Sequence, residues 1–310
     1  MLRAIAPALV ALSLAVPARA QKAPVFRSGL DLVDVTVTVR DARGNLVADL
    51  TASDFVVKEE GREQALSLFA PAALPEEREE LALTLGMLFD TSESMRKDLR
   101  LSQESAVRFL DAIPRARDLV LVFFDQDIRI SRYSSENQQG IFGRILDTKG
   151  EGTTALYDAI AFYLSRVMET PGRKVLLLFT DGDDTTSRLR AEEVDRLVRS
   201  SSVTIYPVAF LGDSKFGSTE AARARSFLAG LADASGGQVF QPRASRELAA
   251  IYQKILDELG SQYVLGYVPG ATARDGRFRR LTVEVKRPGL RVRHRPGYYA
   301  PKDEPPPKQK

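Results

Sequence analysis

The segment Phe89-Asp90-Thr91-Ser92-Glu93-Ser94-Met95 follows directly after an apolar run, Leu81–Leu88. The run predicts a buried strand, and the segment after it predicts a tight loop at the carboxyl end of that strand. This loop carries one carboxylate, Asp90, and two hydroxyls, Ser92 and Ser94. Oxygen ligands of this kind suit a hard divalent cation such as Mg²⁺, which prefers octahedral geometry and keeps some of its water.

Two later segments carry further oxygen ligands. Gly152–Ile160 is a loop that runs into a helix, and it contains Thr154. Val175–Phe179 is a second apolar strand, and it ends in the acidic turn Thr180–Asp184. In open α/β sheets, functional sites gather at the carboxyl ends of the strands, where loops from different strands converge. We therefore expect five side chains to lie together: Asp90, Ser92, Ser94, Thr154 and Asp181.

The surrounding region, residues 81–260, alternates apolar strands with amphipathic helices. Such alternation predicts an α/β fold with a mostly parallel sheet and helices on both faces. Phe123–Ile128 has the pattern of a tight hairpin turn, which would add one antiparallel edge strand. The expected strands are Leu81–Phe89, Leu119–Phe124, Ile128–Arg132, Lys174–Thr180, Val203–Phe210 and Gln238–Gln241.

In order and spacing, the five site residues and Gly182 resemble the metal-ion-dependent adhesion site (MIDAS) of von Willebrand factor A (VWA) domains. The resemblance implies a three-layer, Rossmann-like domain. It also implies that Ser92 and Ser94 bind Mg²⁺ directly, with Mn²⁺ or Ca²⁺ as alternatives, and that Thr154 binds directly or through water. Asp90 and Asp181 would act mainly through waters and hydrogen bonds.

In VWA domains the open coordination position typically takes an Asp or Glu of a partner protein. The resemblance therefore implies metal-dependent protein binding of an adhesion or assembly type, and not catalysis. Four residues would form the rim that faces the partner: Glu93, Thr153, Asp183 and Asp184.

Three of these rim positions have alternative interpretations. Many VWA domains carry glycine between the two serines, where this chain has Glu93. An inward-turned Glu93 would occupy the open coordination position. We expect it to face solvent instead, because an acidic side chain at the start of a helix is favoured by the helix dipole. Asp183 and Asp184 are either solvated loop residues or outer supports of the metal.

The flanks of this region have a different pattern. In Val33–Val39 valines alternate with polar residues, which predicts a strand with one buried face. The N-terminal flank, residues 25–75, and the C-terminal flank, residues 261–300, are each too short to bury a stable core readily. We expect them to combine into one small β-sandwich, with residues 81–260 inserted between them; the alternative is two separate β appendages.

Two hairpins are expected in these flanks, one about Glu60-Gly61 and one across Arg287-Pro288-Gly289. Leu50–Val57 together with Glu60-Gly61, and the later Gly297-Tyr298-Tyr299, resemble a group of exported bacterial "VWFA-related" proteins. This second resemblance would extend over nearly the whole chain.

The first residues have the features of a cleavable secretory signal. A positive charge at Arg3 precedes the apolar run Ala4–Val16, and Pro17–Ala20 ends in an Ala-x-Ala pattern. We expect residues 1–20 to be removed and the protein to be exported to the periplasm or cell surface of a bacterium. The run is too short for a membrane span, which needs about 20 apolar residues, and no other stretch approaches that length.

The amino-acid composition excludes several classes of site and partner. The chain has no cysteine, which excludes disulfides and thiolate metal sites within it. Without residues 1–20 there are 42 basic and 41 acidic side chains, a balance that predicts no nucleic-acid partner. An exported protein without disulfides fits a bacterial envelope. The tail, residues 301–310, is rich in proline and charge and is expected to be disordered.

We do not expect an enzyme. His294 is the only histidine, and we expect it on an exposed strand far from the serines, so that no Ser-His-Asp triad forms. The sequence also lacks a Gly-x-Ser-x-Gly elbow, a phosphate-binding loop ending in Gly-Lys-Ser/Thr, and a His-Glu-x-x-His motif.

Two other functions do not use the metal. In the first, Ser92 and Ser94 only cap a helix, Asp181-Gly182 is an ordinary turn, and the protein is a structural envelope scaffold. In the second, the basic C-terminal hairpin binds a polyanion, such as an envelope glycan or membrane-surface phosphates. The hairpin carries nine basic residues, of which the last three share one strand face: Arg274, Arg277, Arg279, Arg280, Lys286, Arg287, Arg291, Arg293 and Arg295. These residues could equally be solvated charges that discourage edge-to-edge pairing of the sheet.

Overall fold

The computed structural model describes residues 32–71, 82–112, 118–134, 140–211, 219–242, 245–270 and 274–302. The expected signal peptide, residues 1–20, lies outside these residues, as does most of the expected disordered tail, residues 301–310. All described residues belong to one compact unit.

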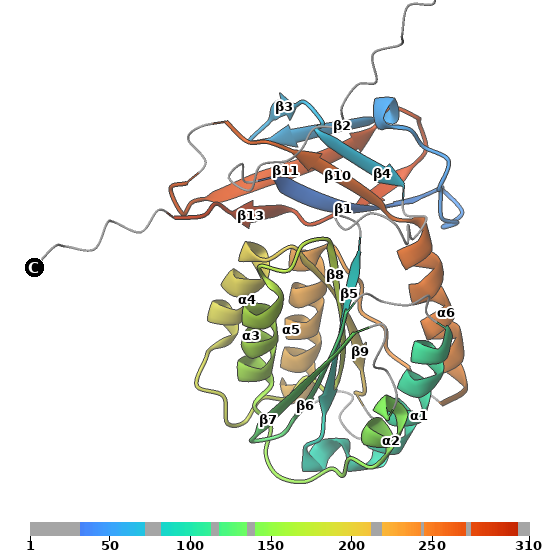
Figure 1. The fold of residues 1–310 in the computed structure, drawn as a ribbon, viewed down its shortest axis with the longest axis vertical. Coiled ribbons are helices and arrows are strands. Elements are labelled where there is room, and N and C mark those ends of the chain that lie inside the picture. Colours follow the sequence, from blue (N-terminus) through green and yellow to red (C-terminus); the bar gives the residue numbers. More distant parts are fainter. Residues whose placement is uncertain are drawn as a thin grey trace, which may run out of the picture. The chain divides into compact units, whose positions relative to one another are not determined.

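A five-stranded sheet lies at the centre of the expected α/β region (Figure 1), with the strand order β7-β6-β5-β8-β9. Neighbouring strands are parallel except for the edge strand β7, which is antiparallel to β6. The expected fold class is therefore confirmed. The strands are β5 (Leu83–Asp90), β6 (Asp118–Phe124), β7 (Ile128–Ser134), β8 (Arg173–Thr180) and β9 (Val203–Ala209).

One expected strand of this sheet is wrong. Gln238–Gln241 forms only an isolated bridge, in which Phe240 pairs in parallel with Val208. The segment is short and lies beside the last strand of the sheet, so a single apolar residue, Phe240, is enough to cover the end of the core.

Helices cover both faces of the sheet, because side chains of each central strand point alternately to the two sides. Leu85, Met87 and Phe89 of β5 belong to one apolar core, whereas Leu88 belongs to the other. The first core includes residues of α1 (Arg96–Ala112), α2 (Ile141–Leu146) and α6 (Ser245–Ser261). The second includes residues of α3 (Leu156–Val167), α4 (Ala191–Ser200) and α5 (Thr219–Ser235).

The two flanks combine into a pair of four-stranded antiparallel sheets, with the orders β12-β1-β10-β4 and β13-β11-β2-β3. Each sheet contains strands from both flanks, and residues from both sheets share one apolar core. The single β-sandwich is confirmed, and separate appendages are excluded. The strands are β1 (Val33–Arg40), β2 (Phe55–Glu59), β3 (Arg62–Gln64), β4 (Leu68–Pro71), β10 (Tyr263–Tyr267), β11 (Phe278–Val285), β12 (Arg291–Arg293) and β13 (Gly297–Tyr299); a 3₁₀ turn, η1 (Ala52–Asp54), precedes β2.

One of the two expected hairpins forms. Glu60 and Gly61, both with positive φ, connect β2 to β3. The hairpin expected across Arg287-Pro288-Gly289 is wrong, because β11 pairs with β2 and β13 whereas β12 pairs with β1 in the opposite sheet. A turn signal shows where the chain changes direction, but it does not show whether the chain stays in its sheet or crosses to the other.

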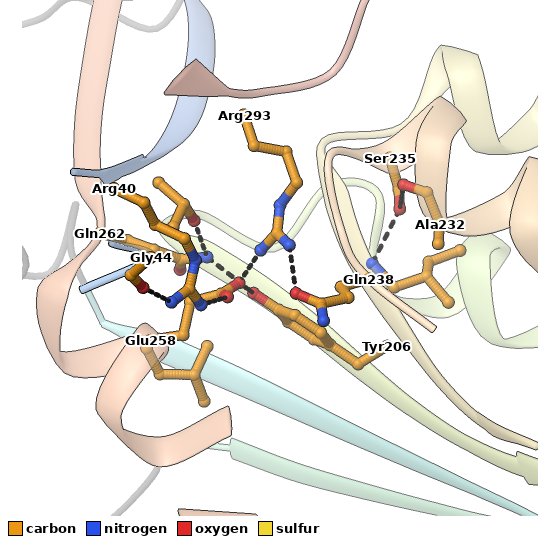
Figure 2. A network of polar contacts seen from close by, with 12 residues as sticks. Arg40, Gly44, Tyr206, Ala232, Ser235, Gln238, Glu258, Gln262 and Arg293 are labelled. Carbon is orange, nitrogen blue, oxygen red and sulfur yellow. Dashed lines mark hydrogen bonds and ion pairs between the residues drawn. The ribbon is translucent and has the colours of Figure 1, made fainter. Parts of the chain in front are cut away.

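The sandwich is joined to α6 by a buried polar network (Figure 2). Glu258 of α6 has no exposed surface, and its carboxylate accepts hydrogen bonds from Arg40 of β1, at 2.9 Å, and from Arg293 of β12. Tyr206 of β9 donates to the same carboxylate at 2.6 Å, and Gln262 donates to the Tyr206 oxygen at 2.7 Å. Two cations of the sandwich thus neutralise one buried anion of the helix.

This network changes the interpretation of the basic C-terminal strand. Arg293 pairs with Glu258, and Arg295 is 8% exposed and donates to the carbonyl oxygens of Ser201 and Asp34. Of the three arginines expected to share an exposed face, only Arg291 is exposed. This strand face alone therefore does not present a continuous basic surface. Five other basic residues of the C-terminal region are exposed, so polyanion binding stays a prediction: Arg274, Arg277, Arg280, Lys286 and Arg287.

His294 is not on an exposed strand face, contrary to expectation. It is partly buried, its Nε2 accepts a hydrogen bond from the Val283 amide at 3.2 Å, and its Nδ1 lies 2.6 Å from the Arg295 carbonyl oxygen. Because a carbonyl oxygen only accepts, this pairing fits a neutral ring with its proton on Nδ1. Burial lowers the pKa of His294, and the charge of Arg295 lowers it further, against a raising effect of the bond to the Arg295 carbonyl.

We expect acid to destabilise the sandwich through His294. The folded-state pKa of His294 lies below its ordinary value of about 6.5, so below that pH the unfolded chain binds more protons than the folded one. The contribution of His294 to the free energy of unfolding should therefore fall as the pH drops below about 6.5, whereas Asp90, whose pKa burial raises to about 7, contributes in the opposite direction. Urea denaturation at pH 7 and pH 5 of the wild type and of His294→Gln isolates the contribution of His294. On acidification the free energy of unfolding of the wild type should fall relative to that of His294→Gln, and equal changes in the two proteins would contradict this prediction.

None of the helices in the described part of the chain is both long and apolar enough to cross a bilayer.

Candidate metal centre

Asp90 is the last residue of β5 and lies buried where the central strands end, with an exposed fraction of 1%. Its Oδ1 accepts a hydrogen bond from the Ser92 amide at 3.0 Å, and its Oδ2 accepts one from the Thr180 hydroxyl at 2.7 Å. Burial raises the pKa of Asp90 to about 7, and the Asp181 carboxylate adds to this, against the lowering effect of the bonds from Ser92 and Thr180.

The two serines lie together on the loop that follows Asp90. The Oγ atoms of Ser92 and Ser94 are 3.1 Å apart; Ser92 is buried and Ser94 is exposed. A 3₁₀ turn, η3 (Glu93–Met95), leads from here into α1. The side chain of Glu93 is 70% exposed and lies 3.4 Å from the Arg96 guanidinium. In this structure Glu93 therefore points away from the serines, in the expected orientation.

Thr154 is brought to the site by the loop before α3. The Glu93 amide donates to the Gly152 carbonyl oxygen at 3.0 Å. This hydrogen bond ties the loop of Thr154 to the loop that carries Ser92 and Ser94, which we call the serine loop. The Thr154 amide donates to the Thr185 hydroxyl at 2.9 Å, and the Thr154 carbonyl oxygen accepts from the amides of Thr185 and Thr186. Thr154 is 3% exposed, whereas Thr153 beside it is exposed.

Asp181 follows directly after β8 and is 2% exposed; its Oδ1 accepts a hydrogen bond from the Asp183 amide at 3.2 Å. The preceding residue, Thr180, donates to Asp90 and accepts from the Gly182 amide at 3.0 Å. The hydrogen bond from Thr180 to Asp90 therefore connects the end of β8 to the end of β5. The five predicted residues are thus brought to one edge of the sheet, on loops that hydrogen bonds tie to one another.

Gly182 is needed for the turn after Asp181. Its φ is +81°, and a Cβ atom built on it would lie 2.9 Å from the Cβ of Ala224 in α5. Both the backbone conformation and the close helix exclude a side chain here.

We expect Gly182→Ala to destabilise the protein by about 1–3 kcal/mol, because the left-handed φ is strained for alanine and α5 must move. Gly230→Ala is the control, since no atom lies within 4 Å of a Cβ at that position in α5. It should stabilise the protein by roughly 0.5–1 kcal/mol through helix propensity. Urea denaturation measures both, and equal effects of the two substitutions would contradict the prediction.

The rim carboxylates differ in their contacts. Asp184 accepts a hydrogen bond from the Tyr157 amide at 3.0 Å, in the first turn of α3, and from the Ser187 hydroxyl at 2.5 Å. Through Oδ2, Asp184 therefore ties its loop to the N-terminus of α3, while its Oδ1 accepts a hydrogen bond from the Ser187 amide within the same loop. Asp183 is half-buried.

A second acidic residue, which sequence reasoning missed, supports the serine loop. Asp125 pairs with Arg129 at 2.6 Å and accepts from the Thr91 hydroxyl at 3.1 Å, while the Thr91 amide donates to the Phe124 carbonyl oxygen. Burial alone would raise the pKa of Asp125, but the hydrogen bonds and charge of Arg129 outweigh it and hold that pKa below its ordinary value. The Asp-x-Asp turn between two strands was a weak signal that could have suggested this role.

The donor set fits a hard divalent cation. Two carboxylates and three hydroxyls supply only oxygen, the ligand type that Mg²⁺ prefers. Among the described residues, none donates a hydrogen bond to the Thr154 hydroxyl or accepts one from it. The same part of the chain contains no group of three or more His, Cys, Asp or Glu side chains that could hold a metal, so this site depends on its hydroxyls.

Residues 85–254 match the von Willebrand factor type A domain family. The chain therefore belongs to that family, whose domains commonly mediate protein interactions. No curated protein matches the chain.

Several solved structures resemble it in fold. A von Willebrand factor type A protein from Catenulispora acidiphila is 14% identical, with a TM-score of 0.49, over 90% of this chain and 76% of its own. An aerotolerance-related membrane protein from Bacteroides fragilis is 14% identical, with a TM-score of 0.46, over 57% of this chain and 98% of its own. The protein BatB from Bacteroides thetaiotaomicron is 17% identical, with a TM-score of 0.42, over 58% of this chain and all of its own.

Proposed function

We propose that this protein captures an acidic side chain of a partner protein through a divalent cation, with Mg²⁺ as the first candidate. The observation that carries the proposal is that hydrogen bonds tie three oxygen-bearing loops to one another at one edge of the sheet. The Glu93 amide bonds to the Gly152 carbonyl oxygen, the Thr154 amide to the Thr185 hydroxyl, and the Thr180 hydroxyl to Asp90. In this proposal the cation is held by Asp90, Ser92, Ser94, Thr154 and Asp181.

The donor types account for binding rather than catalysis. Neutral hydroxyls as direct ligands would leave most of the metal charge uncompensated, so that an open coordination position attracts an external carboxylate. The buried carboxylates, Asp90 and Asp181, would orient bound water and the serine hydroxyls. Ser94 is exposed and Glu93 turns away from it, so an incoming carboxylate can reach the serine side of the site.

We further propose that the protein acts outside the cytoplasm, in the periplasm or at the cell surface of a bacterium. The signal-like residues 1–20 support this proposal. The function proposed for the site does not depend on it.

Capped peptides test the proposal directly. Acetyl-Gly-Asp-Gly-amide should bind the ¹⁵N-labelled protein in Mg²⁺ and perturb resonances of the serine loop, whereas EDTA should abolish the binding. The same peptide with Asn in place of Asp should not bind, because it lacks the charge that the metal attracts. Binding that survives EDTA, or that is the same for Asp and Asn, would refute metal-dependent capture.

Two serine-to-alanine variants show where on the protein the peptide binds. Ser94→Ala removes an exposed hydroxyl of the site and should abolish peptide binding. Ser165→Ala removes an exposed hydroxyl of α3 that bonds only to the Phe162 carbonyl oxygen within the same helix. It should leave peptide binding unchanged, and an equal loss in both variants would place the binding elsewhere.

A further inference from the structure

A groove of about 740 Å³ runs between α1 and the segment that follows α2. Its apolar lining comes from Leu99 of α1 and from Leu146, the last residue of α2. Its other walls carry charged side chains, among them Arg96 and Arg100 of α1 and Lys149 of the following segment. We call this feature the α1–α2 groove.

The α1–α2 groove begins directly beside the metal-binding loop. A Cβ atom built on Gly150 would lie 3.3 Å from the carbonyl oxygen of Ser92 and 3.2 Å from a methyl carbon of Leu99. The groove wall therefore packs on the backbone of a proposed metal ligand. Gln103 holds this wall in place, because its side-chain amide donates to the Thr148 carbonyl oxygen at 2.7 Å.

The groove leaves an apolar side chain uncovered. Leu146 is 47% exposed, one of only three large apolar side chains in the described residues with such exposure. Phe142, one turn earlier on α2, is 43% exposed but does not line the groove. A single exposed leucine is common on protein surfaces, so it is the position of Leu146 in a groove beside the proposed metal ligands that carries the inference.

The charges around the groove would favour an acidic partner once a cation is bound beside it. Three cationic side chains line the groove together with two carboxylates, Glu104 and Glu151, and a third carboxylate, Glu93, pairs with Arg96, so these side chains alone balance. Arg96 and Arg100 are 62% and 88% exposed, and their ion pairs lie on the surface, where such pairs contribute little stability and can be exchanged for a partner's carboxylate. Together with a divalent cation beside them, these groups would steer a negatively charged segment to this edge.

We propose that the α1–α2 groove holds a large apolar side chain of the same acidic partner segment whose Asp or Glu binds the metal. The inference rests on the proposed function and adds the partner's chemistry: an acidic residue accompanied, a few residues away, by a leucine-like side chain. The metal would select the carboxylate, and Leu99 and Leu146 would select the apolar neighbour.

A series of capped peptides tests whether the α1–α2 groove holds an apolar side chain of the partner. Each capped peptide carries one Asp and one Leu separated by zero to three glycines, and the reference peptides have Gly in place of Leu. In Mg²⁺, at least one spacing should bind about fivefold to tenfold more tightly than its reference, since one apolar side chain becomes partly buried. Leu146→Ser should remove this gain, and Phe142→Ser, an equally exposed change outside the groove, should keep it.

The outcomes separate the two proposals. If the Asp-only references bind in Mg²⁺ but leucine adds no affinity at any spacing, the groove inference is wrong and the metal site stands. A gain that survives Leu146→Ser also overturns the groove inference. If no peptide binds, metal-dependent capture fails and the groove inference fails with it. The ¹⁵N spectra of both variants show whether the fold is intact.

Discussion

Replacing Glu258 by alanine is expected to destabilise the protein by about 3 kcal/mol. Removal of one partner from a buried ion pair typically costs about 3–5 kcal/mol, because the remaining charges are left without compensation. The lower end applies here, since Arg40 and Arg293 are 33% and 29% exposed and can regain some water. The hydroxyl of Tyr206, with no exposed side chain, would also lose its acceptor.

Urea denaturation of Glu258→Ala, Glu258→Gln and a control measures this effect. The Gln variant keeps the size of the side chain and removes its charge, so it separates the charge from the cavity. Asp257→Ala is the control, because Asp257 is exposed on the same helix and bonds only to Gln253 one turn away. It should change the free energy of unfolding by less than about 0.5 kcal/mol. A loss below about 1 kcal/mol in Glu258→Ala would mean that the network contributes little.

The second large effect is expected at Asp90. If the site binds Mg²⁺, the wild-type protein should gain about 2.7 kcal/mol at a free Mg²⁺ concentration 100 times the dissociation constant, because only the folded state binds. Asp90→Asn keeps the shape of the side chain but removes its charge, and it should lose at least half of this gain. Loss of an outer support of a metal site typically weakens metal affinity by about 10–100-fold, so the gain should fall to about 0.4–1.4 kcal/mol at the same Mg²⁺ concentration.

Thermal unfolding in MgCl₂ and in KCl of equal ionic strength separates specific binding from screening. Asp257→Asn is the matched control, since it also removes one carboxylate, but from the surface of α6. Its Mg²⁺ gain should equal that of the wild type. An Asp90→Asn variant that keeps the full gain would show that Mg²⁺ binds elsewhere, and a wild type without any gain would remove the basis for metal-dependent capture.

The edge on which the site lies was predictable because its strands carry strong local signals. The apolar runs that became β5 and β8 are buried on both faces, and such runs can only be central strands of a covered sheet. Asp90 and Asp181 follow these strands directly, so the position of each was determined by where the run ended. The same logic would have included Thr180, which stands between the apolar run and the acidic turn, but a threonine at the end of a strand is indistinguishable from an ordinary strand residue.

The contacts between distant segments could not be predicted in this way. Glu258 lies three residues after Ile255 and seven after Ile251, so helical spacing puts it on the apolar face of α6, but the spacing does not show what neutralises it there. Its partner Arg40 is 218 residues away, and no local pattern records such a pairing. Likewise, alternation placed Arg293 and Arg295 on one strand face but did not show that the face turns inward, onto Glu258 and the Ser201 carbonyl oxygen.

The two-part sandwich also sets an order of folding during synthesis. Val33 of β1 pairs with Tyr267 of β10, so the first strand made must wait for more than two hundred residues to leave the ribosome before it finds its neighbour. The parallel sheet between them is complete once β9 has emerged, and its contacts close shorter loops. We expect the inserted domain to fold first and to bring the two flanks together, so that the sandwich forms last. Until then the edge of β1 is unpaired, which makes the nascent chain most exposed to aggregation at its N-terminal strand.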